Sequence, residues 1–321
     1  MIWADLLHLS VNQWGHDTWY PEDARGWKAS FKDRTPCDDG VWRRITDRLA
    51  QVGANMVVID VGDAVKCPSH PELAVSNAWS AEKMSAEVAR LKSIGLEAVP
   101  KLNFATTHDH WLHEYGRMVG TPQYYDVCRD MIRDVCDIFA HPRLFHIGMD
   151  EELMDQIRVF KGIGTFRRGR AYWHDVKFYA TCCEKAGARP WMFSDYVMDY
   201  EKEFLANCPK SIVQSVWYYW DKFENEPKDK WFRRTHWESF ARIERGGFDQ
   251  IPCGSSWTAK GEKEIDNQIG QLVEHVGKVV SKERILGYLQ TSWEYPVPGV
   301  NEEKNMRAIE HIEATIRKHG K

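Results

Sequence analysis

Three acidic residues in a row, Asp150, Glu151 and Glu152, follow the apolar stretch LFHIGM at residues 144–149. A short apolar run is consistent with a buried strand, so the acids stand where that strand should end. Two neighbouring carboxyl groups repel each other when both are ionised, which tends to keep one of them protonated near neutral pH. Asp150 and Glu151 are therefore the candidate catalytic residues, and a pair of acids is typical of glycoside hydrolysis.

Both carboxyl groups can reach one substrate only under a geometric condition. Adjacent residues on an extended strand point to opposite faces, so Asp150 and Glu151 converge only where the strand turns into its loop. Gly148 lies just upstream and eases such a bend. We expect a sharp turn at this point.

Amide, carboxylate and aromatic side chains follow the other predicted strands. Indole faces pack against the C–H faces of sugars while carboxylates and amides bind hydroxyl groups, so this mixture favours a carbohydrate. The chain has 15 Trp, including Trp14, Trp19 and Trp111 in the first and third loops. The residues that we predict to bind substrate are Asn12, Asp63, Asn103, His108, His146, Asp195, Trp217, Tyr218, Trp257, Trp293 and Glu294.

Apolar runs that alternate with longer amphipathic stretches must position these residues. The intervals between the runs repeat apolar residues every three or four positions, as helices do. Eight strands in alternation with helices predict an α/β fold, a single (β/α)8 TIM barrel over residues 1–321, in which the strand ends form the active site. An open doubly wound sheet is disfavoured because no GxGxxG follows the first strand. The predicted strands are residues 5–11, 55–61, 96–104, 144–150, 190–196, 212–220, 249–257 and 285–293.

Composition narrows the possible partners and location. The formal net charge of −4 provides no basic surface for nucleic acid, and no apolar run is long enough to cross a membrane. Eight cysteines occur without a CxxC pair, so we expect mostly buried thiols, with Cys37 and Cys67 able to pair. We expect a cytoplasmic protein in a reducing compartment, although a removed secretion signal would change this expectation. The sequence does not predict an oligomeric state.

The motif HIGMDE at residues 146–151 resembles the His-x-Gly-Gly-Asp-Glu motif of the family 20 glycoside hydrolases, the β-N-acetylhexosaminidases. Four further segments resemble family segments in the same order, so the similarity covers nearly the whole barrel. These are SHPEL at 69–73, VARLKSIGLEAVPKLNFATTH at 88–108, WMFSDY at 191–196 and YLQTSWE at 288–294.

This resemblance implies a mechanism and roles for the two acids. Glu151 would be the general acid, and Asp150 would orient the 2-acetamido group of the substrate, whose carbonyl oxygen attacks the anomeric carbon. The substrate thus provides the nucleophile, which agrees with the lack of an acid at the end of the seventh predicted strand. The resemblance implies a retaining, exo-acting enzyme that hydrolyses amino-sugar glycosides and needs no cofactor or metal.

The chain also departs from the family pattern. Asn12 and Gln13 stand where family members commonly have an arginine, and Met149 replaces the second glycine of the motif. Lys101 and Asn103 stand where acids are usual, and Phe193 replaces a usual tryptophan. The seventh strand lacks the family tyrosine that holds the acetamido oxygen, a role for which Trp257 and Tyr218 are candidates. The chain is therefore a divergent relative.

Two other function classes are compatible with the sequence. The segment THDHWLHE contains His108, Asp109, His110 and His113, which together with His8 and His146 would suit a metal-dependent barrel hydrolase or sugar isomerase. A catalytically inactive carbohydrate-binding barrel is the second alternative. The basic run RRGR at 167–170 would suit a sulfated or acidic sugar, or be a solvated loop.

Overall fold

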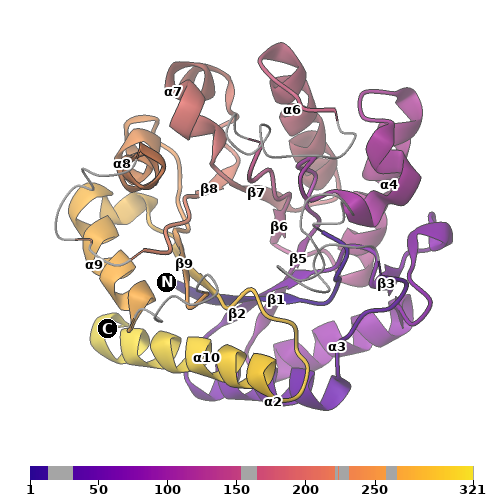
Figure 1. Ribbon diagram of the computed structural model, residues 1–321, viewed down its shortest axis with the longest axis horizontal. Coiled ribbons are helices and arrows are strands. Elements are labelled where there is room, and N and C mark those ends of the chain that lie inside the picture. Colours follow the sequence, from indigo (N-terminus) through magenta and orange to yellow (C-terminus); the bar gives the residue numbers. More distant parts are fainter. Residues whose placement is uncertain (14–31, 153–164, 221–222, 224–230, 258–265, 321) are drawn as a thin grey trace.

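The computed structural model describes residues 1–13, 32–152, 165–220, 223, 231–257 and 266–320. Its centre is a ring of eight parallel strands with helices around the outside (Figure 1). The strand order is β8-β7-β6-β5-β2-β1-β10-β9, and parallel bridges from Gln214 to Gln250 and from Trp217 to Cys253 join the two end strands. The predicted TIM barrel is therefore confirmed.

Every predicted strand segment overlaps a strand of the barrel, and six of the eight contain it whole. The strand β1 begins three residues before its predicted segment and β7 one residue before. The shortest are three residues long, and after one of them, β6, the chain turns at Gly148 and Met149, which have positive φ angles. The barrel strands are β1 (Ile2–His8), β2 (Met56–Asp60), β5 (Glu97–Lys101), β6 (Leu144–His146), β7 (Arg189–Phe193), β8 (Val213–Ser215), β9 (Cys253–Ser255) and β10 (Gly287–Thr291).

Helices follow the strands in the alternation that the sequence predicts. Local signals explain several helix starts: the Asp38 side chain accepts a hydrogen bond from the backbone N–H of Val41, and Thr121 does the same for Tyr124 before α4. The helices are α2 (Asp39–Gln51), α3 (Ala81–Ser93), α4 (Pro122–Ile138), α6 (Arg170–Lys185), α7 (Tyr196–Asn207), α8 (Trp231–Arg245), α9 (Gln268–Val279) and α10 (Val300–His319), with short 3-10 turns η2 (Pro71–Leu73), η3 (His110–Arg117) and η4 (Lys282–Arg284).

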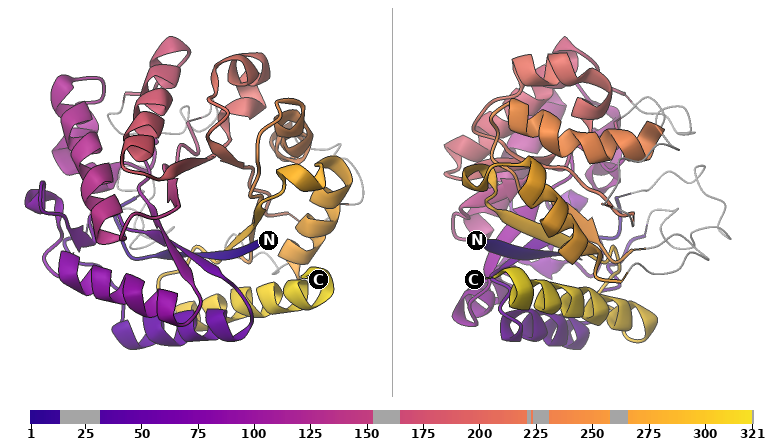
Figure 2. Two further views of the ribbon diagram at one scale, coloured as in Figure 1. Left: turned by 180° about the vertical axis from the view of Figure 1, so that it is seen from behind. Right: turned by 90° about the vertical axis from the view of Figure 1, so that its left-hand side faces the viewer.

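A small two-stranded sheet, β3 (Val65–Lys66) with β4 (Trp79–Ser80), lies outside the barrel and is not predicted by the sequence pattern. Both chain ends lie on the side of the barrel where the strands begin (Figure 2). The strand ends that carry the predicted site residues therefore lie on the opposite face.

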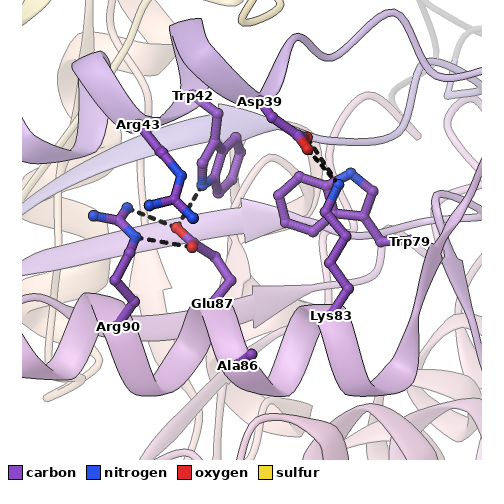
Figure 3. A pocket seen from close by; sticks show the side chains of 8 residues that line it. All are labelled: Asp39, Trp42, Arg43, Trp79, Lys83, Ala86, Glu87 and Arg90. Atoms are coloured by element: carbon purple, nitrogen blue, oxygen red, sulfur yellow. Dashed lines mark hydrogen bonds and ion pairs between the residues drawn. The ribbon is translucent and has the colours of Figure 1, made fainter.

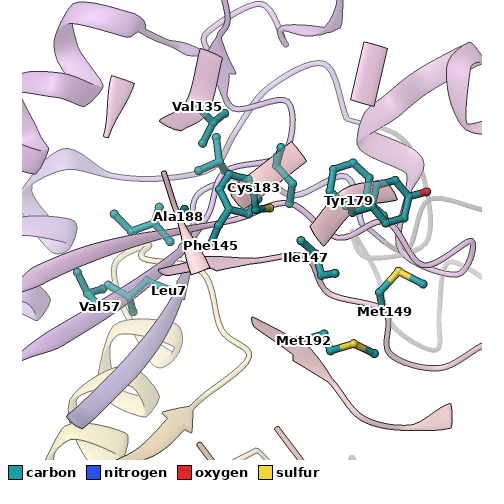
Figure 4. Packing of buried hydrophobic residues seen from close by; sticks show 14 of the residues in the cluster. Leu7, Val57, Val135, Phe145, Ile147, Met149, Tyr179, Cys183, Ala188 and Met192 are labelled. Carbon is teal, nitrogen blue, oxygen red and sulfur yellow. The ribbon is translucent and has the colours of Figure 1, made fainter. Parts of the chain in front are cut away.

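Two buried layers result from the alternation of side chains along each strand. On β1, Ala4 and Leu6 point into the barrel, whereas Trp3 and Leu7 pack against the surrounding helices. Figure 4 shows part of the outer layer, where residues of neighbouring strands meet side chains of α4 and α6. Met149 belongs to this outer layer, so its side chain anchors the turn after β6 in the core.

All eight cysteines are free thiols, so the pairing of Cys37 with Cys67 considered above is absent. Seven of them are buried, as expected from the sequence, and Cys37 is partly exposed. Within the described ranges, no helix combines the length and the apolar character that crossing a membrane requires.

Candidate active site

The turn after β6 has an unusual backbone. Gly148, Met149 and Glu151 have φ angles of 70°, 75° and 61°, in the left-handed region that side chains disfavour. Gly148 cannot be replaced without displacing its neighbours, because a Cβ there would lie 2.0 Å from Oδ1 of Asn103. The left-handed φ of Met149 explains why a glycine suits this position. A methionine there adopts a disfavoured backbone conformation, which the packing of its side chain in the core must offset.

The turn brings the two acids together on one imidazole. Nε2 of His108 lies 3.7 Å from Oδ2 of Asp150 and 3.4 Å from Oε2 of Glu151. The side chain of Asp150 is 8% exposed, whereas that of Glu151 is 30% exposed. Glu151 is thus the acid that faces incoming molecules, while Asp150 lies deeper.

Asn103, at the end of β5, holds the deeper acid in place. Its Nδ2 donates to Oδ1 of Asp150 at 2.7 Å, and its Oδ1 accepts from the backbone N–H groups of Ala105 and Met149, both at 3.1 Å. The carbonyl oxygen of Asn103 accepts from Nε1 of Trp111 at 2.8 Å. This asparagine, predicted as a substrate ligand, therefore fixes the orientation of Asp150.

His108 is buried, and burial lowers its pKa although the charge of Asp150 opposes that shift. Its Nδ1 lies 2.8 Å from the hydroxyl of Thr107, which also donates to the carbonyl oxygen of Asp150. The lowered pKa favours a neutral ring at neutral pH. A neutral imidazole can exchange a proton with Glu151 through Nε2 at 3.4 Å, whereas the Asp150 oxygen at 3.7 Å lies beyond hydrogen-bond distance.

Asp195, which follows β7, is a third carboxyl group at this centre. It accepts the backbone N–H of Glu151 at 3.0 Å and Nε1 of Trp217 at 2.9 and 3.1 Å. Burial and the charge of Asp150 raise the pKa of Asp195 to about 7, against the effect of these hydrogen bonds. Asp195 therefore holds the backbone of the exposed acid in its left-handed conformation.

Aromatic rings line the barrel next to the acids. Trp293 lies 5.3 Å from the ring of His8 and 6.4 Å from those of Phe193 and Tyr219, while Trp217 stacks on Tyr219 at 4.9 Å. These rings come from β1, β7, the loop after β8 and the loop after β10. They form a partly exposed apolar wall of the kind that carries a sugar ring.

Tyr218 does not belong to this wall. It is fully buried in the outer layer and its hydroxyl accepts a hydrogen bond from Nε of Arg233. The adjacent Tyr219 points the other way, packs with the barrel-lining residues and has its pKa raised by burial. The sequence interpretation missed Tyr219, which the alternation along the segment Trp217 to Trp220 could have identified.

A buried ion pair lies at the inner end of the site. Nζ of Lys101 donates to Oδ2 of Asp60 at 2.6 Å, and Nδ1 of His8 lies 3.2 Å from the same oxygen. Burial opposes the ionisation of Asp60, but Lys101 and His8 outweigh it and lower its pKa. The two residues meet because they are register partners at the ends of the neighbouring strands β2 and β5.

His146, the first residue of the motif, stabilises the backbone of the turn after β6. Its Nδ1 accepts the backbone N–H of Gly148 at 3.0 Å, and its ring packs against Trp191 and Phe193. Burial, with a smaller contribution from the charge of Lys101, lowers the pKa of His146 well below its ordinary value. A neutral imidazole in this place shapes the backbone that carries Asp150.

Asn12 and Asp63 form a hydrogen-bonded cluster separate from the one around Asp150 and Glu151. Asp63 accepts hydrogen bonds from Ser10 at 2.7 Å and Asn12 at 2.6 Å, and lies 3.4 Å from Nε2 of His113. Burial raises the pKa of Asp63 despite these bonds. Asn12 also exchanges two 2.8 Å hydrogen bonds with the backbone of Lys32. The contacts of Asn12 and Asp63 thus stabilise the backbone of the surrounding loops. That these two residues also bind substrate stays a prediction.

The last two predicted ligands lie at the end of the barrel. Glu294 is 8% exposed and accepts from Nζ of Lys304 at 2.6 Å. Trp257 follows β9, is partly exposed, and donates its backbone N–H to Oγ of Ser255 at 2.8 Å. Trp14 and Trp19 lie outside the described residues. Across the described ranges, no three His, Cys, Asp or Glu side chains are grouped so that they could hold a metal ion.

A hollow of about 420 Å³ on the outer surface lies between α2 and α3, away from the strand ends (Figure 3). Trp42 and Trp79 line it, but both are buried, and Nε1 of Trp42 donates to Glu87. Ion pairs between Lys83 and Asp39 and between Arg90 and Glu87 cross the same surface. Because both indoles are buried and these four charged side chains are paired, we assign this hollow to the packing between α2 and α3.

Comparison with solved structures identifies similar barrels. Dispersin B is 14% identical with a TM-score of 0.61, covering 89% of this chain and 96% of its own. The GH20 β-N-acetylhexosaminidase of Streptomyces coelicolor A3(2) is 12% identical with a TM-score of 0.63, covering 96% of this chain and 63% of its own. A GH20 exo β-N-acetylglucosaminidase of Vibrio harveyi, solved with N-acetylglucosamine, is 12% identical with a TM-score of 0.61, covering 98% of this chain and 54% of its own.

This chain therefore spans little more than half to under two thirds of the length of those two GH20 enzymes. No protein-family profile and no curated protein matches the sequence. At these identities the likeness establishes the fold. It confirms, at the level of the fold, the resemblance to family 20 that the motif indicates.

Proposed function

We propose that the protein is a glycoside hydrolase related to the family 20 β-N-acetylhexosaminidases. The observation that carries this proposal is the convergence of Asp150 and Glu151 on His108 at the end of β6. A motif match alone leaves the side chains unplaced, whereas this geometry puts two acids with different exposure at one centre, beside a wall of aromatic rings.

The proposed reaction uses the amide of the substrate as its nucleophile. Glu151 donates its proton to the glycosidic oxygen as the bond to the anomeric carbon breaks, and the 2-acetamido oxygen forms a new bond to that carbon. Asp150, held by Asn103, accepts the amide N–H and stabilises the positive charge of the oxazolinium ring. Water then attacks the anomeric carbon while the bond from that carbon to the acetamido oxygen breaks and the amide re-forms. Glu151 takes the proton of that water, and the two displacements together retain the configuration.

The surroundings of the pair support this assignment. The end of β9 and the two described residues that follow it, Ser256 and Trp257, include no acid that could act as an enzyme nucleophile. The partly exposed Trp293 and Tyr219 provide a surface for a pyranose ring. We propose a terminal β-linked N-acetylhexosamine as the sugar that this wall holds, and exo action by analogy with the exo enzyme named above.

The decisive experiment compares two aryl β-glycosides that differ only at carbon 2. The 2-acetamido glycoside should be cleaved with retention and the 2-hydroxy glycoside hardly at all, while a thiazoline mimic of the oxazolinium ring should inhibit strongly. Efficient cleavage of the 2-hydroxy glycoside, insensitive to the thiazoline, would overturn the substrate-assisted mechanism. Failure to cleave any glycoside would overturn the proposed function.

A further inference from the structure

Glu152, the third acid of the run, has a different environment from its two neighbours. Its side chain is 1% exposed, and Oε1 accepts the backbone N–H of Thr106 at 2.7 Å and Nη2 of Arg167 at 2.7 Å. A carboxylate so enclosed cannot meet a substrate. Its bonds instead connect the turn after β6 with the loop after β5.

Arg167 is the centre of this connection, so this member of the basic run at 167–170 is not available as part of a cationic surface. The guanidinium is buried, and its Nη2 also donates to the carbonyl oxygen of Phe104 at 2.5 Å. Its Nη1 donates to Oδ2 of Asp175 at 3.1 Å and to the hydroxyl of Tyr179 at 2.8 Å, both on α6. One planar group thereby fastens two catalytic-face loops to one helix.

The network continues from α6 into α4. Tyr179 stacks on Phe104 with ring centroids 4.3 Å apart, and its hydroxyl lies 2.7 Å from that of Tyr124 on α4. Asp175 accepts a 2.6 Å hydrogen bond from the hydroxyl of Tyr125, also on α4. The network therefore ties both loops to α4 and α6, two helices that pack against each other.

The hydrogen bonds of Arg167 and Glu152 are made to residues next to the proposed active-site residues in the sequence. Phe104 follows Asn103, Glu152 follows Glu151, and Thr106 precedes His108 by two residues. Displacement of either loop would change the separation of Glu151 and His108, which is 3.4 Å.

Stability alone is a weak reason for such a network. Replacing a buried ion pair by apolar side chains of similar volume is often neutral or stabilising. Moreover, Nε of Arg167 and Oε2 of Glu152 have no hydrogen-bond partner within the described residues. A pair that is incompletely satisfied but linked to both loops is better explained by the geometry it imposes.

We infer that Arg167 and Glu152 are positioning residues that hold the Asp150–Glu151 turn against the loop bearing Asn103 and His108. The reaction they serve rests on the proposed function. The positioning itself is a property of the two loops that can be measured without any substrate.

The test uses the double variant Arg167→Met/Glu152→Met in the full chain, because each single variant would leave the other member of the Arg167–Glu152 pair buried and unpaired. Asp175, which also loses its contact with Arg167, keeps the hydrogen bond from Tyr125 and the contact with His174. With an aryl 2-acetamido glycoside, we expect kcat to fall about 10²-fold while KM changes less than about threefold, because misplacement by about 1 Å costs that much in rate. The melting temperature should stay within about 5 °C of the unmodified protein. Arg167→Lys keeps the charge but cannot span four acceptors, and should give a partial loss of kcat.

The control is Arg129→Gln/Asp126→Asn, which removes an exposed ion pair of 2.7 Å on the surface of α4. Its kcat should be unchanged. A double Met variant with unchanged melting temperature and kcat within about twofold of the original would overturn the inference. If the double variant fails to fold, Arg167→Lys decides by the same criterion.

Amide hydrogen exchange separates this inference from the proposed function. Peptides covering 103–109 and 144–152 should exchange faster in the variant than in the unmodified protein, while peptides of α9 and α10 should not change. If the unmodified protein cleaves no glycoside, the proposed function fails and exchange alone decides the inference. Unchanged exchange in both loops would then overturn it.

Discussion

Asp150 and Glu151 are adjacent in the sequence but differ in what surrounds them. Asp150 receives a hydrogen bond from Asn103 and is nearly buried, whereas Glu151 is the more exposed and is held through its backbone by Asp195. An acid that must give its proton to a leaving group has to face that group, and an acid that must hold an amide has to be fixed. The two environments match the two proposed roles.

We predict that Glu151→Gln lowers kcat/KM about 10³-fold for glycosides with poor leaving groups, because it removes the transferable proton. Activated aryl glycosides need less protonation and should lose much less activity. Steady-state kinetics on both substrate kinds checks this, with the exposed Glu114→Gln as the matched control. Equal losses on both kinds of substrate would remove Glu151 from the acid role.

Asp195 should make the stability of the protein depend on pH. An unfolded Asp releases its proton near pH 4, whereas burial and Asp150 raise the pKa of folded Asp195 to about 7. Between these values the folded chain binds the additional proton, so the free energy of unfolding falls as pH rises. This one group contributes a slope of about 1 kcal/mol per pH unit from about pH 5 to 7.

Asp195→Asn should remove that slope. Urea unfolding of both proteins at several pH values measures it, and the difference between the two curves isolates Asp195 from other titrating groups. Asp137→Asn, at an exposed position, is the control and should leave the slope unchanged. A parallel pair of curves for the original protein and Asp195→Asn would show that Asp195 is ionised throughout this range.

At the scale of elements, the site depends on how β6 ends. A three-residue strand runs into a turn with three left-handed residues, and the outer-layer packing of Met149 together with the hydrogen bond from Gly148 to His146 supports it. Backbone strain of this kind persists only where the surrounding structure holds it. The support comes from the neighbouring strands β5 and β7, through Asn103 and Asp195.

Replacement of Gly148 tests this arrangement. Gly148→Ala should cost roughly 3 kcal/mol of unfolding free energy, because a Cβ would strike Asn103 and the φ of 70° disfavours alanine. Gly95→Ala is the matched control, since Gly95 has a φ of 88° with nothing within 4 Å of the added Cβ. It should cost about 1 kcal/mol and leave activity intact. Equal losses in the two variants would mean that the turn tolerates a side chain.

At the scale of the whole molecule, closure of the barrel assembles the aromatic wall. His8, Phe193, Tyr219 and Trp293 come from positions that are up to 285 residues apart, and they meet because β1 lies beside β10 and the ring closes between β8 and β9. Because β7 is the neighbour of β6, the same closure sets the aromatic wall next to the acids that follow β6.

We predict that Trp293→Ala raises KM about tenfold or more, because the variant lacks the ring that we propose stacks on the sugar. The melting temperature should fall only modestly, since the indole is partly exposed. Trp237→Phe, a change at a partly buried ring on α8 that contacts His275, is the control and should leave KM unchanged. An unaltered KM with a collapsed melting temperature in Trp293→Ala would mean that the indole only packs.

The eight strands, their alternation with helices and the acidic turn could all be predicted from the sequence alone. These features depend on local periodicity and on residues adjacent in the chain, such as Gly148 and Asp150, so the pattern itself contains the information. The resemblance of HIGMDE to a known motif identified the two acids in the same way.

The tertiary structure alone decided which groups each side chain meets. Tyr219 rather than Tyr218 faces the barrel, Asn103 binds Asp150, and Arg167 is buried on Glu152 instead of lying in a basic surface. Asn103 and Asp150 are 47 residues apart, and Asp60 and Lys101 are 41 apart. Hydrogen bonds and ion pairs are short-ranged, so they form only between groups that the closed barrel brings within about 3 Å of each other. The separation of two residues along the chain does not predict which pairs meet in this way.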